Sequence, residues 1–136
     1  LFYAGELYAS FLYVSDLIRS AGIGVCYPVG GHTPVATMAS ILHGLRINVI
    51  AGVPTTIMNL VAYLREHPEQ RPDIDLILLG GETFYDDQVE AVQECFGTEI
   101  RVHSLLYASV DGGELGYFDA ASCEKDEHRC FDESTI

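Results

Sequence analysis

The fold follows from one stretch near the middle of the chain, Ile74-Asp75-Leu76-Ile77-Leu78-Leu79-Gly80-Gly81-Glu82-Thr83. Apart from Asp75, its first six residues are apolar, which is typical of a strand that is buried on both faces of a parallel sheet. The two glycines end this strand, and a short polar segment then leads into an amphipathic pattern at residues 86–96. The order of strand, turn and helix predicts one unit of an α/β fold.

The same alternation continues in both directions along the chain. Apolar residues at helical spacing predict helices at residues 6–21, 33–46, 55–66 and 86–96, and short apolar runs predict strands at 25–29, 48–51, 74–79 and 100–106. Thr33 is expected to cap the second helix, with Pro34 at its first position. We therefore expect an α/β fold with a mainly parallel sheet flanked by helices over residues 1–113. Shorter strand-like pieces and many acids predict that residues 114–136 begin a β-rich, acidic extension.

Glycine-rich turns should meet at one edge of this sheet, because the carboxyl ends of parallel strands lie together. These turns fall at residues 30–32, 52–54, 80–83 and 107–113. The last reads Tyr107-Ala108-Ser109-Val110-Asp111-Gly112-Gly113 and is expected to be a loop that carries a ring, a hydroxyl and a carboxylate. Glycine lets a ligand approach the backbone closely, so we expect a ligand crevice at this edge. The alternative is that these turns contain glycine for backbone reasons alone.

The composition restricts the classes of partner. The chain has 20 acidic against 7 basic residues and a net charge of −13, which argues against binding to a nucleic-acid backbone. A single nucleotide remains compatible, since backbone N–H groups and a metal ion can meet its charge. No apolar run reaches the roughly 20 residues that span a bilayer, and we find no signal-peptide pattern. We expect no nucleic-acid or membrane partner and a cytoplasmic location with reduced thiols.

Four motifs, in this order and spacing, resemble the adenylate-forming superfamily of acyl-CoA synthetases and ligases. Gly80-Gly81-Glu82-Thr83, then a helix, a strand and residues 107–111, are similar to the two loops that frame the nucleotide in that superfamily. Tyr27-Pro28-Val29-Gly30-Gly31 and Ala51-Gly52-Val53-Pro54-Thr55 are similar to its middle region. In particular, the chain resembles the phenylacetate–CoA ligase-like branch, which includes adenylating enzymes of phenazine antibiotic biosynthesis. The resemblance covers nearly the whole chain and implies a central part of the large N-terminal domain.

The resemblance implies a site for ATP and Mg²⁺. In that family, the residues that match Gly81, Glu82 and Thr83 pass along the adenine edge. The tyrosine that matches Tyr107 stacks on the ring, with Ala108 and Ser109 following it in the same loop. The acid that matches Asp111 is the catalytic residue and supports Mg²⁺ and the phosphates. The residue types agree with these roles, because an aromatic face suits a purine and a carboxylate oxygen suits Mg²⁺.

The resemblance also implies contacts with the carboxylic acid substrate at Tyr3, Gly31, His103 and Gly112. For Tyr3 and His103, packing in the core is the alternative role. The motif departs from the family at three positions: Ala108 replaces a glycine, Val110 replaces a hydroxyl residue, and Asp111 is shorter than the common Glu. The family's phosphate loop is expected upstream of this chain, and its ribose-binding Asp and catalytic Lys downstream. The fragment alone is therefore expected to be inactive.

A second constellation lies in the acidic extension, where Cys123, His128 and Cys130 form a C-x4-H-x-C pattern. Cysteine and histidine at such short spacing can bind Zn²⁺, although a tetrahedral site needs a fourth ligand. Phenylacetate–CoA ligase-like proteins often have a Cys/His-rich stretch in this region, which favours a zinc site. The alternative is a surface hairpin with ordinary reduced thiols. Elemental analysis of protein purified without added metal distinguishes the two.

We therefore predict part of an ATP-dependent ligase that activates a carboxylic acid, expected to be aromatic, as its acyl adenylate. ATP and Mg²⁺ are the expected cofactors, with CoA as a candidate acceptor of the acyl group and Zn²⁺ as a candidate structural ion. The expected partners are the small-molecule acid and ATP, and a homodimer is the candidate assembly. The competing prediction is a non-catalytic, doubly wound module that uses the same sheet edge to bind a nucleotide or a protein.

Overall fold

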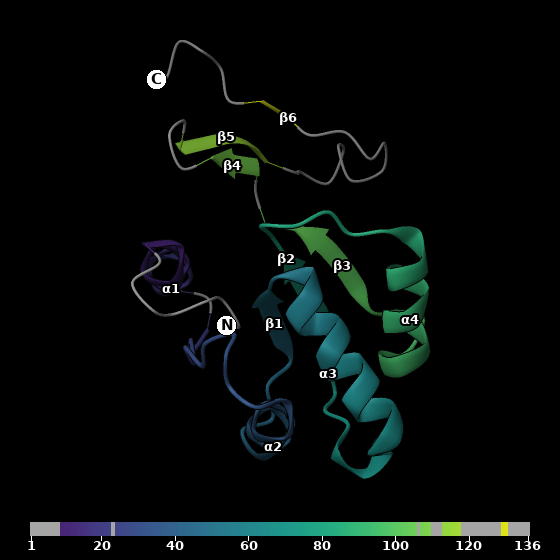
Figure 1. Ribbon diagram of the computed structural model, residues 1–136. Coiled ribbons are helices and arrows are strands. Elements are labelled where there is room, and N and C mark those ends of the chain that lie inside the picture. Colours follow the sequence, from purple (N-terminus) through teal and green to yellow (C-terminus); the bar gives the residue numbers. More distant parts are fainter. Residues whose placement is uncertain (1–8, 23, 106, 110–112, 118–128, 131–136) are drawn as a thin grey trace.

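The computed structural model describes residues 9–22, 24–105, 107–109, 113–117 and 129–130. Its larger sheet contains three strands in the order β1-β2-β3, namely Val49–Gly52, Leu76–Leu79 and Arg101–Ser104 (Figure 1). Both pairs are parallel, and the strands begin level, with Val49 beside Leu76 and Leu76 beside Arg101. Helices occupy the connections between these strands, as parallel pairing requires. The prediction of an α/β fold with a parallel sheet is confirmed.

The helices of the described residues are α1 (Ala9–Ala21), α2 (Val35–Gly44), α3 (Pro54–Glu66) and α4 (Asp86–Phe96), with a short 3₁₀ turn, η1, at Pro68–Gln70. Helix α3 connects β1 to β2 and contacts both α2 and α4, which lie on either side of it in Figure 1. The predicted helices at 55–66 and 86–96 agree with α3 and α4 to within one residue. In the part of the chain that the structure describes, no helix is both long and apolar enough to cross a membrane.

The hydrophobic core lies where α3 packs against the parallel sheet. Ile57, Leu60 and Leu64 line one face of α3 at i, i+3 and i+7, and all three are completely buried. They share a cluster with Ile77 of β2 and Val92 of α4, which are also completely buried. Because the core holds α3 against the strands, it fixes where the first turn of α3 lies relative to the carboxyl ends of the sheet.

Cys95 of α4 belongs to this core and is 1% exposed. Burial raises the pKa of its thiol above the usual value of 9.0, and the positive charges of Arg71 and Arg65 only partly oppose this. We expect iodoacetamide at pH 8 to label Cys95 of the folded protein much more slowly than the half-buried Cys26. Peptide mass spectrometry after timed labelling measures both rates, and equal rates would contradict the prediction.

The same shift in the pKa of Cys95 has a consequence for stability. The unfolded chain releases this proton near pH 9.0, whereas the folded chain holds it to higher pH. The contribution of the neutral Cys95 thiol to the free energy of unfolding is therefore fully present below pH 9.0. It is lost as the pH rises through the pKa of the folded state.

The predicted strand at residues 25–29 is wrong. These residues form no strand, and Val25 is 77% exposed where a buried residue was expected. Pro28 has no N–H group to donate to a neighbouring strand, which disfavours pairing within this segment. The chain instead runs into a turn at Gly30, whose φ is +86° and whose carbonyl accepts the N–H of Thr33. An apolar run that contains a proline was thus mistaken for a buried strand.

The predicted cap of α2 is also wrong. The Thr33 hydroxyl donates to the carbonyl oxygen of Val29 at 2.9 Å, four residues earlier, instead of accepting a bond from the helix. Pro34 is the residue immediately before α2, and it provides no side-chain cap. Thr33 therefore stabilises the turn that precedes the helix.

A second, antiparallel sheet follows the first in the chain, with β4 at Tyr107–Ser109, β5 at Gly113–Tyr117 and β6 at Arg129–Cys130. The prediction that residues 107–113 form a loop throughout is therefore wrong for its first three residues and for Gly113, which begins β5. Tyr107 pairs with Gly116 in an antiparallel ladder, with an irregularity between Tyr107 and Ala108. Tyrosine favours a pleated strand, which agrees with its place in this ladder. Asp111 and Gly112 lie outside the described residues.

Candidate functional site

The turns that follow β1 and β2 lie side by side at the carboxyl edge of the parallel sheet. Hydrogen bonding continues past the strand ends, because the Gly80 N–H donates to the Gly52 carbonyl at 3.2 Å. On the other side of β2, the Leu105 N–H donates to the Leu79 carbonyl at 2.7 Å. The described part of the chain therefore brings two of the predicted glycine-rich turns together, as the parallel topology requires.

Gly81 brings the β2–α4 turn directly against the β1–α3 turn. Its φ of +87° lies in the region that residues with a side chain rarely adopt. A Cβ added at Gly81 would lie 3.3 Å from Cγ1 of Val53, the residue that precedes α3. Glycine at this position thus permits both the turn and the close approach. The residue was singled out from the sequence as part of a nucleotide site, and the structure places it at the expected edge.

The carboxylate of Glu82 joins the same turn to the first turn of α3. One oxygen, Oε2, accepts the backbone N–H of Thr55 at 2.9 Å and the Thr55 hydroxyl at 2.6 Å. The partial positive charge at a helix N-terminus favours a carboxylate there. Glu82, Thr55 and the neighbouring Thr83 are all exposed, so this part of the edge is open to a ligand.

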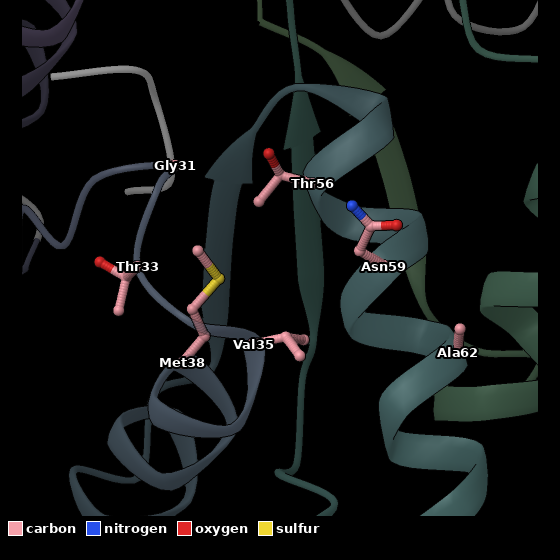
Figure 2. A pocket seen from close by; sticks show the side chains of 7 residues that line it. All are labelled: Gly31, Thr33, Val35, Met38, Thr56, Asn59 and Ala62. Atoms are coloured by element: carbon pink, nitrogen blue, oxygen red, sulfur yellow. The ribbon is translucent and has the colours of Figure 1, made fainter. Parts of the chain in front are cut away.

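An open groove of about 340 Å³ lies between α2 and α3. Figure 2 shows Gly31 and Thr33 on one side, Thr56 and Asn59 on the α3 side, and the side chain of Met38, a residue of α2, between these two groups. Met38 is 2% exposed and gives the groove an apolar wall. Gly31 was predicted to contact a substrate, and it lines this groove. Because Thr56 follows Thr55, the groove and the Glu82 contact meet at the first turn of α3.

The remaining predicted site residues belong to other elements or lie outside the described residues. His103 is half-buried on β3, level with Leu78 of β2. Tyr107, Ala108 and Ser109 belong to β4 of the second sheet. Tyr3, Asp111, Gly112, Cys123 and His128 lie outside the described residues, and Cys130 is placed only as part of β6. Over the ranges that the structure describes, no three His, Cys, Asp or Glu side chains are grouped to hold a metal ion.

Three residues of α3 at this edge were not predicted from the sequence, namely Thr55, Thr56 and Asn59. The available signal was the polar start of the helix, where two threonines directly follow the Gly52-Val53-Pro54 turn. Helix N-termini at the carboxyl edge of a parallel sheet commonly face ligands, so polar residues in that first turn are natural candidates. The arrangement offers two hydroxyls and an amide at the start of α3, next to a groove to which Met38 gives one apolar wall.

The fold and this edge define the chain as an α/β protein with a candidate ligand site at the carboxyl ends of its parallel strands. No family model matches the sequence. Among curated proteins, the chain is similar to indoleacetate–lysine synthetase from Pseudomonas savastanoi, with 28% identity over 76 residues. The match takes in 56% of this chain and 19% of that protein, so the matched segment spans about a fifth of the relative's length. The chain is thus a distant, partial relative of a ligase.

Proposed function

We propose that this chain is the nucleotide-binding part of a ligase that uses ATP to activate a carboxylic acid as its acyl adenylate. The observation that carries the proposal is the meeting of the 80–83 turn with the first turn of α3 at the carboxyl edge of the parallel sheet. The similarity to a synthetase that joins an acid to an amino acid, as its name states, supports the same reaction class.

The proposed chemistry has two steps. A carboxylate oxygen of the acid attacks the α-phosphorus of ATP, the bond from that phosphorus to pyrophosphate breaks, and the acyl adenylate forms. An acceptor then attacks the acyl carbon, its proton passes to solvent, and AMP leaves. The name of the relative favours an amine as the acceptor, whereas the resemblance to phenylacetate–CoA ligase-like proteins favours the thiol of CoA.

The residues divide between the two substrates. Tyr107 is proposed to stack on adenine, and the backbone of Gly81, Glu82 and Thr83 to pass along the ring edge. The groove beside Gly31 is proposed to take the acid, with Met38 providing apolar contact for an aromatic ring. Asp111 offers the hard carboxylate oxygen that Mg²⁺ prefers, and the ion would supply positive charge beside the phosphates.

Pyrophosphate release by the full-length protein tests this proposal. We expect release that requires ATP and an acid, with aryl acids preferred over long alkyl acids in a matched panel. Adding lysine or CoA as the acceptor, and identifying the acyl product by mass spectrometry, distinguishes the two second steps. Failure of every acid to elicit pyrophosphate release, together with retained nucleotide binding, would favour a non-catalytic binding module.

Replacing Tyr107 by alanine is expected to weaken ATP binding about tenfold, because stacking on an aromatic ring is worth roughly 1–3 kcal/mol in nucleic-acid systems. Tyr107→Phe keeps the ring and is the matched control, with an expected change of less than about twofold on the same principle. Isothermal titration of the full-length protein with ATP measures both affinities, and thermal melting checks the fold. Normal ATP affinity with lowered thermal stability would assign Tyr107 a packing role instead.

A further inference from the structure

The contact between Glu82 and Thr55 supplies a hydrogen-bond acceptor that the start of α3 lacks. Pro54 occupies the first helical position and has no N–H group. The N–H groups of Thr56 and Ile57 both donate to the Val53 carbonyl, at 3.1 and 3.2 Å. The Thr55 N–H is one of the first amides of the helix, which have no acceptor within it. Its acceptor comes instead from Glu82, which lies 27 residues further along the chain.

The helix itself supplies no alternative acceptor at this position. Val53 is the residue before the helix, and its side chain has no polar atom with which to cap Thr55. The Glu82 carboxylate accepts the Thr55 hydroxyl as well, so one oxygen holds two donors of the same residue. Both bonds are charge-assisted, which makes them stronger than bonds between neutral groups.

The same contact determines where the 80–83 turn lies. Gly81 lies close to the β1–α3 turn, with the site of its missing Cβ 3.3 Å from Val53 Cγ1. The side chain of the next residue, Glu82, accepts the hydroxyl of Thr55. One residue of the turn is therefore bonded to the start of α3 and its neighbour lies close beside it, while the core holds α3 through Ile57 and Leu60. The turn is fixed relative to the rigid part of the fold.

We propose that Glu82 is a positioning residue, which acts through Thr55 to hold the 80–83 backbone in place for a nucleotide. The inference rests on the proposed function, and it assigns the Glu82 side chain a role away from ATP. An unattached carboxylate beside the phosphates would repel them, whereas the N-terminus of α3 offsets its charge. The backbone of the turn then remains available to the adenine edge while the carboxylate faces the helix.

The test compares variants of the full-length protein in steady-state pyrophosphate release. Glu82→Ala removes the acceptor, Thr55→Val removes only the hydroxyl, and Thr55→Ser retains it. We expect Glu82→Ala to raise the KM for ATP roughly threefold to tenfold, by analogy with the loss of a helix cap, while kcat changes less than about twofold. Thr55→Val should raise the same KM by a smaller factor, and Thr55→Ser should restore it.

The double variant and a matched control complete the experiment. Because the Thr55 hydroxyl acts through Glu82, Glu82→Ala with Thr55→Val should be no worse than Glu82→Ala alone. Glu94→Ala is the control, since Glu94 pairs with Arg65 at the far end of α3, and it should leave the KM for ATP unchanged. Hydrogen exchange should show faster exchange of the Thr55 amide in Glu82→Ala without nucleotide.

The outcomes separate this inference from the proposed function. If the wild-type protein releases pyrophosphate but the effects of Glu82→Ala and Thr55→Val multiply, the two side chains act independently and the inference is wrong. Unchanged KM values in Glu82→Ala and Thr55→Val would also overturn it. If the wild-type protein releases no pyrophosphate with any acid, the proposed function fails, and the nucleotide role of Glu82 fails with it.

Discussion

Replacing Leu60 by alanine is expected to lower the free energy of unfolding by about 2–5 kcal/mol, the usual range for a fully buried leucine. Leu60 is 0% exposed and lies near the middle of α3, in the cluster shared with Ile77 and Val92. Truncation removes apolar contacts and leaves a cavity that neighbouring residues on three elements can fill only in part. A typical domain is stable by only about 5–15 kcal/mol, so this loss is a large share of the total.

Urea unfolding, followed by circular dichroism, measures the effect. Leu12→Ala is the matched control, because it makes the same chemical change in α1 at a side chain that is 68% exposed in the structure. The control is expected to stay within about 0.5 kcal/mol of the wild type. Equal losses in the two variants would mean that α3 does not form the centre of the core.

The parallel sheet and its helices could be predicted because their signals are local. Helix α4 is one example: two acids stand in its first turn, Gln88 accepts the N–H of Tyr85, and Gly97 follows the helix with a φ of +106°. These are start and stop signals that depend only on nearby residues. Strand β2 was recognised for a similar reason, since a short apolar run between polar segments is typical of a strand within a parallel sheet.

The errors arose where tertiary pairing decides the structure. Residues 25–29 and residues 74–79 are both short apolar runs, but Pro28 interrupts the first and the described residues show no strand there. Tyr107 was expected in a loop, and its strand depends on pairing with Gly116. A short apolar or mixed run alone does not show whether a partner strand is present.

In the candidate site, too, the local features could be predicted from the sequence and the tertiary contacts could not. Gly81 and Glu82 could be selected from the sequence, because two glycines and an acid directly follow a buried strand. The bond from Thr55 to Glu82 could not be predicted, since it joins residues 27 positions apart across two different turns. The groove beside Gly31 could not be predicted from the sequence either, because it depends on how α2 packs against α3. Sequence patterns thus located the edge of the sheet but not the contacts made there.

Replacing Asp111 by asparagine is expected to slow adenylate formation by about 10–100-fold, a range typical for residues that tune a metal site. Asparagine has nearly the size of aspartate but lacks the negative charge that attracts Mg²⁺. The Mg²⁺ concentration for half-maximal rate should therefore rise, whereas ATP affinity measured without the metal should change little. Single-turnover pyrophosphate release at a series of Mg²⁺ concentrations measures both the rate and the metal requirement.

Asp73→Asn provides the comparison for this variant, because Asp73 is an exposed acid in the loop before β2, and its Mg²⁺ response should match the wild type. Both variants lose one negative charge. A difference between their Mg²⁺ responses therefore reflects where the charge was, because the amount of charge removed is the same. An Asp111→Asn protein with a normal Mg²⁺ response and a lowered melting temperature would assign Asp111 to stabilising a turn. The proposed metal role requires the opposite pattern, since loss of a phosphate-side carboxylate should change catalysis while leaving the packed core intact.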